Sequence, residues 1–171
     1  KVCVGEAKTF TIVVNPNAEM NDVEDQVVCH GESTESIIFS TNNLNGVMTY
    51  TWTNDTPSIG LSSSGIGDIL AFTATNSSTA PIVATITVTP AFENGGNLCA
   101  GEDKTFTITV NPTAQFDQPL DQVVCNGDST SIVEFTTQNA GGATTYTWTN
   151  DTPSIGLSSS GIGDILAFTA T

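Results

Sequence analysis

The sequence predicts an all-β fold, built as tandem β-sandwich units of about 96 residues. Three observations predict it. The chain repeats itself with a period of 96 residues, and 51 of the 75 positions present in both copies are identical. Threonine, serine, valine and isoleucine runs alternate with glycine and proline, a composition that favours strands and tight turns. No segment shows the 3.6-residue period of an amphipathic helix.

The strands are predicted where apolar and polar residues alternate. In one of them Tyr50 and Trp52 alternate with threonines, so both side chains point to the same face, which we expect to be the core. Tyr146 and Trp148 are their counterparts and are predicted core aromatics too. Within the repeat, strands are predicted over residues 27–28, 37–39, 49–53, 69–75 (with Leu70 and Phe72 on one face), 82–89 and 106–110.

The repeat also predicts the domain borders. The natural polypeptide is expected to be longer than this chain, because both ends cut through a unit. Short linkers, one of them carrying Pro119, are expected to limit hinge freedom. The predicted parts are the last strand of a preceding repeat (1–16), a linker (17–24), a complete repeat (22–112), a second linker (113–120) and the opening part of the next repeat (118–171).

The charge is strongly negative, with 18 acidic residues, 3 lysines, no arginine and a net charge of −15. A nucleic-acid binder needs basic residues to displace phosphate counterions, so that class is excluded, and adsorption to an anionic membrane is disfavoured. No apolar run approaches the ~18–20 residues of a membrane span, so direct membrane insertion is not expected.

Four cysteines at repeating positions predict disulfides and therefore an oxidising, extracellular setting. Two pairings respect the repeat: Cys29–Cys99 within one unit, or Cys3–Cys29 together with Cys99–Cys125 across units. We favour Cys29–Cys99, because the strand that follows Cys3 spans about 20 Å and disulfide Cα atoms must lie within ~7 Å. Cys3 and Cys125 would then have partners outside the fragment.

No catalytic constellation is visible, so the chain is not expected to be an enzyme. Its only histidine, His30, is replaced by Asn126 in the second copy, which therefore cannot build a histidine-dependent site. A metal is expected only as Ca²⁺ at a unit junction, where hard oxygen ligands gather. The weak candidate ligands are Glu19, Asp22, Glu24 and Asp25, and the competing interpretation is a solvated acidic linker.

The repeat contains the motifs CAGE at 99–102, TFTITVNP at 105–112, VCNGD at 124–128 and TYTWTN at 145–150. In these residues it resembles the PKD-like and Ig-like units of giant surface proteins from gliding and related Bacteroidota. The resemblance implies an Ig-like sandwich, export by the type IX route and display on the cell surface as a long filament, as in gliding-motility adhesins.

The expected function is a non-catalytic structural or adhesive stalk. Its expected partners are neighbouring repeats of the same chain, and surface polysaccharide or other cells. One alternative is a carbohydrate-binding module, which would stack sugars on the Tyr50 and Trp52 rings. The other alternative is a subunit of a self-assembling extracellular fibre.

Overall fold

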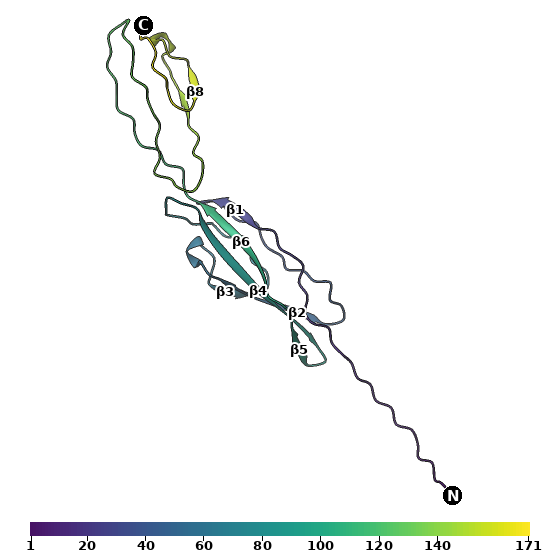
Figure 1. Ribbon diagram of the computed structural model, residues 1–171. Coiled ribbons are helices and arrows are strands. Elements are labelled where there is room, and N and C mark those ends of the chain that lie inside the picture. Colours follow the sequence, from purple (N-terminus) through teal and green to yellow (C-terminus); the bar gives the residue numbers. More distant parts are fainter.

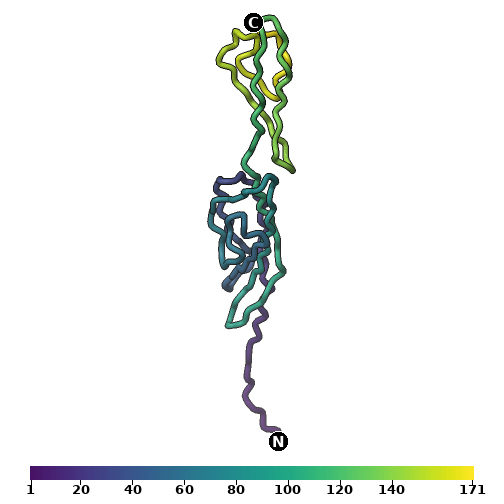
Figure 2. The backbone as a smooth tube through the Cα atoms, turned by 90° about the vertical axis from the view of Figure 1, so that its left-hand side faces the viewer, coloured from purple at the N-terminus to yellow at the C-terminus, as the bar shows by residue number.

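The computed structural model describes all of residues 1–171, and strands make up almost all of its regular structure. Two three-residue 3-10 turns, η1 (Pro57–Ile59) and η2 (Pro153–Ile155), are the helical elements. No helix has the length and apolar character needed to cross a membrane. The all-β class predicted from the sequence is confirmed. The molecule is elongated: two units lie end to end, and the N-terminal segment projects from one end (Figure 1, Figure 2).

The N-terminal unit is built on one mixed sheet. Its strand order is β1-β6-β4-β2-β3, and β5 pairs with the far end of β4. β1 runs parallel to β6, and the other pairs are antiparallel. The central strand β4 is also the longest, so both halves of the sheet depend on it. The strands are β1 (Gln26–Cys29), β2 (Val47–Asn54), β3 (Ser64–Ile66), β4 (Ile82–Asn94), β5 (Asn97–Ala100) and β6 (Lys104–Asn111).

Alternate residues of β4 and β6 form the centre of the core. Ile86 and Val88 of β4 and Ile108 and Val110 of β6 are fully buried, while the residues between them are mostly threonines on the opposite face. This is the period of two that the sequence predicts for both strands. The other members of the core cluster are Met20, Ile37, Phe39, Tyr50, Trp52, Ile59, Leu61, Ile69, Ala74, Ala84 and Phe106.

Two extended segments, residues 33–39 and 69–74, pair with each other and contribute to the same core. The Ile37 and Ile69 backbones exchange hydrogen bonds of 2.8 and 3.0 Å, and both side chains are buried. The pairing consists of isolated bridges rather than a continuous ladder. Leu70 is 74% exposed although Phe72 packs against the core, so the predicted common face of these two residues is wrong.

The C-terminal unit repeats half of this arrangement. It contains β7 (Thr147–Thr149) and β8 (Ser160–Ile162), which form a two-stranded sheet. Bridges Ser129–Thr169 and Val133–Ile165 recur 96 positions after Ser33–Thr73 and Ile37–Ile69. None of residues 1–171 occupies the places that β4 and β6 hold in the N-terminal unit.

The segments predicted as linkers lie against the units. Ala18 and Met20 are buried, and the Asn21 N–H donates to the Ser40 carbonyl at 2.9 Å. The Asp117 N–H likewise donates to the Thr136 carbonyl at 2.9 Å. Part of each predicted linker is therefore held by the unit that follows it. Residues 1–16, predicted as a strand, form no strand here and are largely exposed.

Candidate functional site

The cysteines do not form the predicted pair. All four thiols are free, and Cys29 and Cys99 lie at opposite ends of β4. Cys29 of β1 pairs with Asn111 of β6, next to Val110, which pairs with Ile82 at the start of β4. Cys99 of β5 pairs with Phe92, near the end of β4. Ten residues of strand separate those ends by about 33 Å, far beyond the ~7 Å that a disulfide allows. The Cys29–Cys99 prediction is wrong.

The alternative pairing is not made either. The N-terminal segment, which contains Cys3, projects from the end of the unit opposite to β1, whose last residue is Cys29 (Figure 1). Cys99 lies at the end of β4 that faces away from the C-terminal unit, which contains Cys125 (Figure 1). The cysteines therefore give no support to an oxidising compartment, and the N-terminal unit packs without a covalent link.

The acidic candidates do not converge on a cation site. Asp22 forms an ion pair with Lys104, and an Asp25 carboxylate oxygen accepts the Thr107 N–H at 2.6 Å. Glu19 and Glu24 do not join them, since no group of three such side chains has the spacing to hold a metal ion. The two aspartates instead fix the start of the unit onto β6.

The aromatic pair of β2 is buried. Trp52 lies against Gly65 of β3 and donates its indole N–H to the Gly67 carbonyl at 3.1 Å. Tyr50 stacks at a tilt against Phe39, with ring centroids 5.3 Å apart, and burial raises the pKa of the Tyr50 hydroxyl. Both belong to the core, as predicted, and neither ring offers the exposed face on which a sugar stacks. In the C-terminal unit Tyr146 and Trp148 are half-buried.

His30 has a structural position. It is exposed, and its Nδ1 accepts the Asn76 N–H at 2.8 Å. The side-chain amide of Asn76 in turn donates to the Val110 carbonyl at 2.7 Å. These bonds tie the loop after residue 75 to the end of β6, at the end of the unit that faces its neighbour.

The contact between the two units is small and specific. The Ala140 N–H donates to the Thr79 carbonyl at 2.8 Å, and Gly141 lies against Pro81. At the opposite end of the N-terminal unit, Asn15 and Asn94 exchange two hydrogen bonds of 2.9 Å. No pattern in the sequence signals these contacts, because they join loops that only the end-to-end arrangement brings together.

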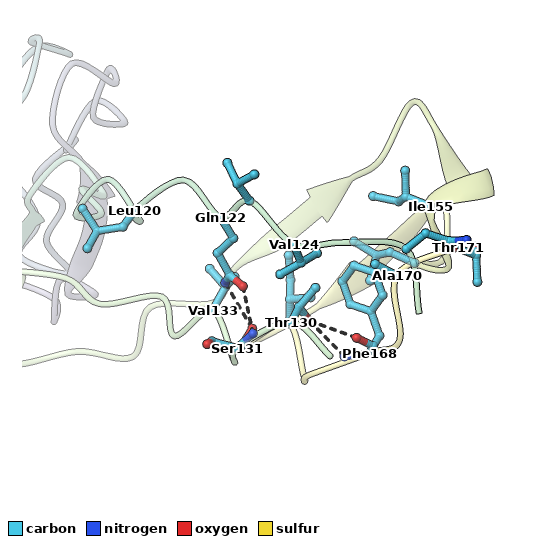
Figure 3. Close-up of a pocket in the computed structure, with 14 residues that line it drawn as sticks. Leu120, Gln122, Val124, Thr130, Ser131, Val133, Ile155, Phe168, Ala170 and Thr171 are labelled. Atoms are coloured by element: carbon cyan, nitrogen blue, oxygen red, sulfur yellow. Dashed lines mark hydrogen bonds between the residues drawn. The ribbon is translucent and has the colours of Figure 1, made fainter. Parts of the chain in front are cut away.

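An apolar groove lies open in the C-terminal unit (Figure 3). It has a volume of about 530 Å³, and nine of its fourteen lining residues are hydrophobic. Its rim is fixed by local hydrogen bonds: Gln122 exchanges two with the Ser131 backbone, and Thr130 Oγ1 exchanges two with the Phe168 backbone. We call this site the C-terminal groove, and its apolar lining includes Val124, Val133, Ile155, Leu157, Ile165 and Phe168.

Comparison with known protein families finds no matching family model, and comparison with curated proteins finds no significant relative.

Proposed function

We propose that this chain is a non-catalytic, length-building segment of a secreted surface filament or adhesin. In this proposal Ig-like, PKD-like β-sandwich units of about 96 residues follow one another end to end. The sheet of the N-terminal unit and the paired segments 33–39 and 69–74 that share its core support the sandwich. The bridges that recur after 96 positions support the tandem arrangement.

The observation that carries the proposal is the shortness of the junction between the units. β6 ends at Asn111, and the Gln115 N–H already donates to Asn139 Oδ1 at 2.7 Å within the next unit. Only residues 112–114 separate the two, and Pro112 among them has a fixed φ. With the Ala140–Thr79 hydrogen bond beside it, such a junction resists bending, which is what a stalk needs.

The charge suits a crowded surface. A net charge of −15 makes neighbouring copies repel one another and keeps an extended chain in solution. The single histidine and its replacement by Asn126 support the absence of catalysis in this proposal. The carbohydrate-binding alternative loses its candidate residues, because Tyr50 and Trp52 are in the core.

Small-angle X-ray scattering and negative-stain electron microscopy test the proposal. Each complete unit should add about 40 Å to a thin rod, since thirteen residues of β4 at ~3.3 Å each set its length. A compact particle whose maximum dimension is that of a 171-residue globule would refute it. Antibody labelling of intact source cells tests the surface location separately, and labelling only after lysis would contradict it.

A further inference from the structure

One face of the N-terminal sheet packs on the core, and the residues of its other face are exposed or half-exposed along every strand. On β2, β4 and β6 this outer face consists largely of threonines, three from each strand, because they alternate with the residues that point into the core. The strand register places them side by side: Thr87 of β4 pairs with Thr105 of β6 and with Thr53 of β2. We call this surface the threonine face.

The threonine face also gathers most of the large apolar side chains that this unit exposes. Within residues 22–112, eight such side chains are exposed, and five of them lie on this face: Val27, Val47, Ile66, Val83 and Leu98. Ile66 is the most exposed of them, at 81%. Single apolar residues scattered over a surface are ordinary, but their collection on one face marks an interaction surface.

The acidic residues of the chain avoid this face. Of the 18 acidic residues, Glu93 is the one whose side chain lies on it, near the end of β4. Three aspartates stand at its border, each held by a hydrogen bond from a β4 or β6 threonine: Asp25, Asp55 and Asp103. The face therefore has an uncharged centre and a charged rim, which is how the interfaces between proteins are built.

We propose that the threonine face binds the threonine face of a second copy, so that two chains pair side by side. A partner of this face must present an uncharged surface of threonines and aliphatic residues, and the face itself meets that description. Burying its apolar side chains supplies the driving force. The same surface is used on both copies, so the contact closes on a dimer.

The size of the face suits a stable dimer. The thirteen residues of β4 give it a length of about 43 Å, and five strands ~4.8 Å apart give a width of about 19 Å. The resulting area, on the order of 800 Å², is what each partner buries in an interface of standard size. Sheets packed face to face keep their strands within about 30° of each other. Because β4 and β6 run along the long axis of the unit (Figure 1), the paired rods would lie alongside each other.

Charge and repetition then set the strength of the pairing. The rim carboxylates of two copies repel each other, so pairing should strengthen when salt screens them. In a tandem filament each unit would present such a face, and weak contacts between single units would add up along two neighbouring filaments. This last step rests on the proposed function, whereas the pairing of two N-terminal units does not.

Sedimentation velocity over a series of concentrations, at low and at high ionic strength, tests the proposal. The wild type should show a reversible monomer–dimer equilibrium with more dimer at high ionic strength. Thr51→Glu places a carboxylate within the face and should raise the dissociation constant about tenfold or more, because an interface buries an unpaired charge only at high cost. Glu93→Gln removes the one charge on the face and should lower the dissociation constant.

Thr73→Glu is the matched control, because Thr73 is an equally exposed threonine on the segment that pairs with residue 33, away from the threonine face. It has the same net charge as Thr51→Glu and should associate like the wild type. Circular dichroism and urea unfolding check that both variants fold. A wild type that stays monomeric at high ionic strength would overturn the inference, as would equal dimerisation of Thr51→Glu and the wild type. Scattering from monomeric Thr51→Glu reports the rod shape alone, so it tests the proposed function separately.

Discussion

At the residue scale, the packing of Trp52 on Gly65 decides how the β2–β3 hairpin closes. A Cβ atom added to Gly65 would lie 2.1 Å from Trp52 Cζ2, deep in the core. The indole cannot retreat, because it is buried and hydrogen-bonded to the Gly67 carbonyl. The glycine is thus required by close approach rather than by an unusual backbone angle.

We expect Gly65→Ala to destabilise the N-terminal unit by about 1–3 kcal/mol, the usual cost of overpacking a core. Urea unfolding followed by tryptophan fluorescence measures this. Gly161→Ala is the matched control: its Cβ would lie 2.2 Å from Trp148 Cζ2, and Trp148 makes the same hydrogen bond to the Gly163 carbonyl at 3.1 Å, but its ring is only half-buried, so fewer neighbours oppose its displacement. A cost for Gly161→Ala equal to that for Gly65→Ala would contradict this explanation.

The ionised carboxylate of Asp55 contributes to the stability of the folded N-terminal unit. Its carboxylate accepts the Thr85 N–H at 2.8 Å and the Thr56 hydroxyl at 2.8 Å, and these bonds, that of Thr85 first, hold the pKa of Asp55 below 3.8. The ionised form therefore stabilises the folded state. That contribution is fully present above pH 3.8 and is lost as the pH falls through the lower folded value.

Asp55→Asn should lower the urea midpoint at pH 7, and the difference from wild type should shrink on acidification below pH 3.8, where the wild-type carboxylate becomes protonated. Asp151→Asn is the control. The Asp151 carboxylate accepts the Thr152 hydroxyl at 2.9 Å, but no counterpart of β4 lies beside it to donate a second hydrogen bond. It should leave the midpoint unchanged at either pH. A difference for Asp55→Asn that stays constant as the pH is lowered from neutral to well below 3.8 would show that the charge plays no part.

At the element scale, β4 and β5 show where sequence reasoning reaches its limit. Alternation located β6 and the buried face of β4, because period-two patterning reports which residues meet a core. The strand predicted over residues 82–89 ends just before Pro90, which has no N–H to donate. β4 nevertheless continues to Asn94. On one side, its residues up to Val88 pair with β6 and its residues from Ala91 pair with β5, so Pro90 lies between the two pairings, where no ladder hydrogen bond from its nitrogen is needed.

The same hairpin explains the failed disulfide prediction. β5 folds back along the end of β4 and so carries Cys99 to the far end of the unit from Cys29. β5 has only four residues and follows a Gly-Gly turn, and no local sequence pattern indicates that such a short strand reverses the chain and moves Cys99 away from Cys29. The C-terminal groove was not predicted either, although all its lining residues belong to the segment predicted as the opening part of the next repeat (118–171).

We expect Cys29→Ser to leave the free energy of unfolding unchanged within about 0.5 kcal/mol, as for an exposed surface substitution. The result should be the same with and without reductant, and a thiol reagent should titrate all four cysteines in the unfolded wild type purified without reductant. A cystine closing a loop of about 70 residues would instead contribute about 4 kcal/mol. Loss of that size on reduction would restore the Cys29–Cys99 pair.

At the scale of the whole molecule, the two ends of a unit are complementary. The loop of the N-terminal unit that contains Thr79 and Pro81 contacts the loop of the C-terminal unit that contains Ala140 and Gly141. Because this junction involves few atoms, the stiffness of the rod depends on a small contact, while the stability of the N-terminal unit depends on its core. Bending and unfolding should therefore respond to different substitutions.

A substitution at Gly141 should separate bending at the junction from unfolding of the N-terminal unit. It has φ of 75°, and a Cβ there would lie 3.1 Å from Pro81 Cδ in the other unit. Gly141→Val should strain the loop and push it from Pro81, breaking the Ala140–Thr79 hydrogen bond and letting the units bend. Gly142→Val is the control, because a Cβ at Gly142 meets nothing within 4 Å and its φ is not positive.

Small-angle X-ray scattering from Gly141→Val should show a shorter and broader distribution of interatomic distances than scattering from Gly142→Val. The urea transition of the N-terminal unit should stay within about 0.5 kcal/mol in both, since neither residue belongs to its core. Identical scattering profiles would mean that residues 112–114 alone hold the units in line. The short connection, rather than the loop contact, would then be the element that makes the rod stiff.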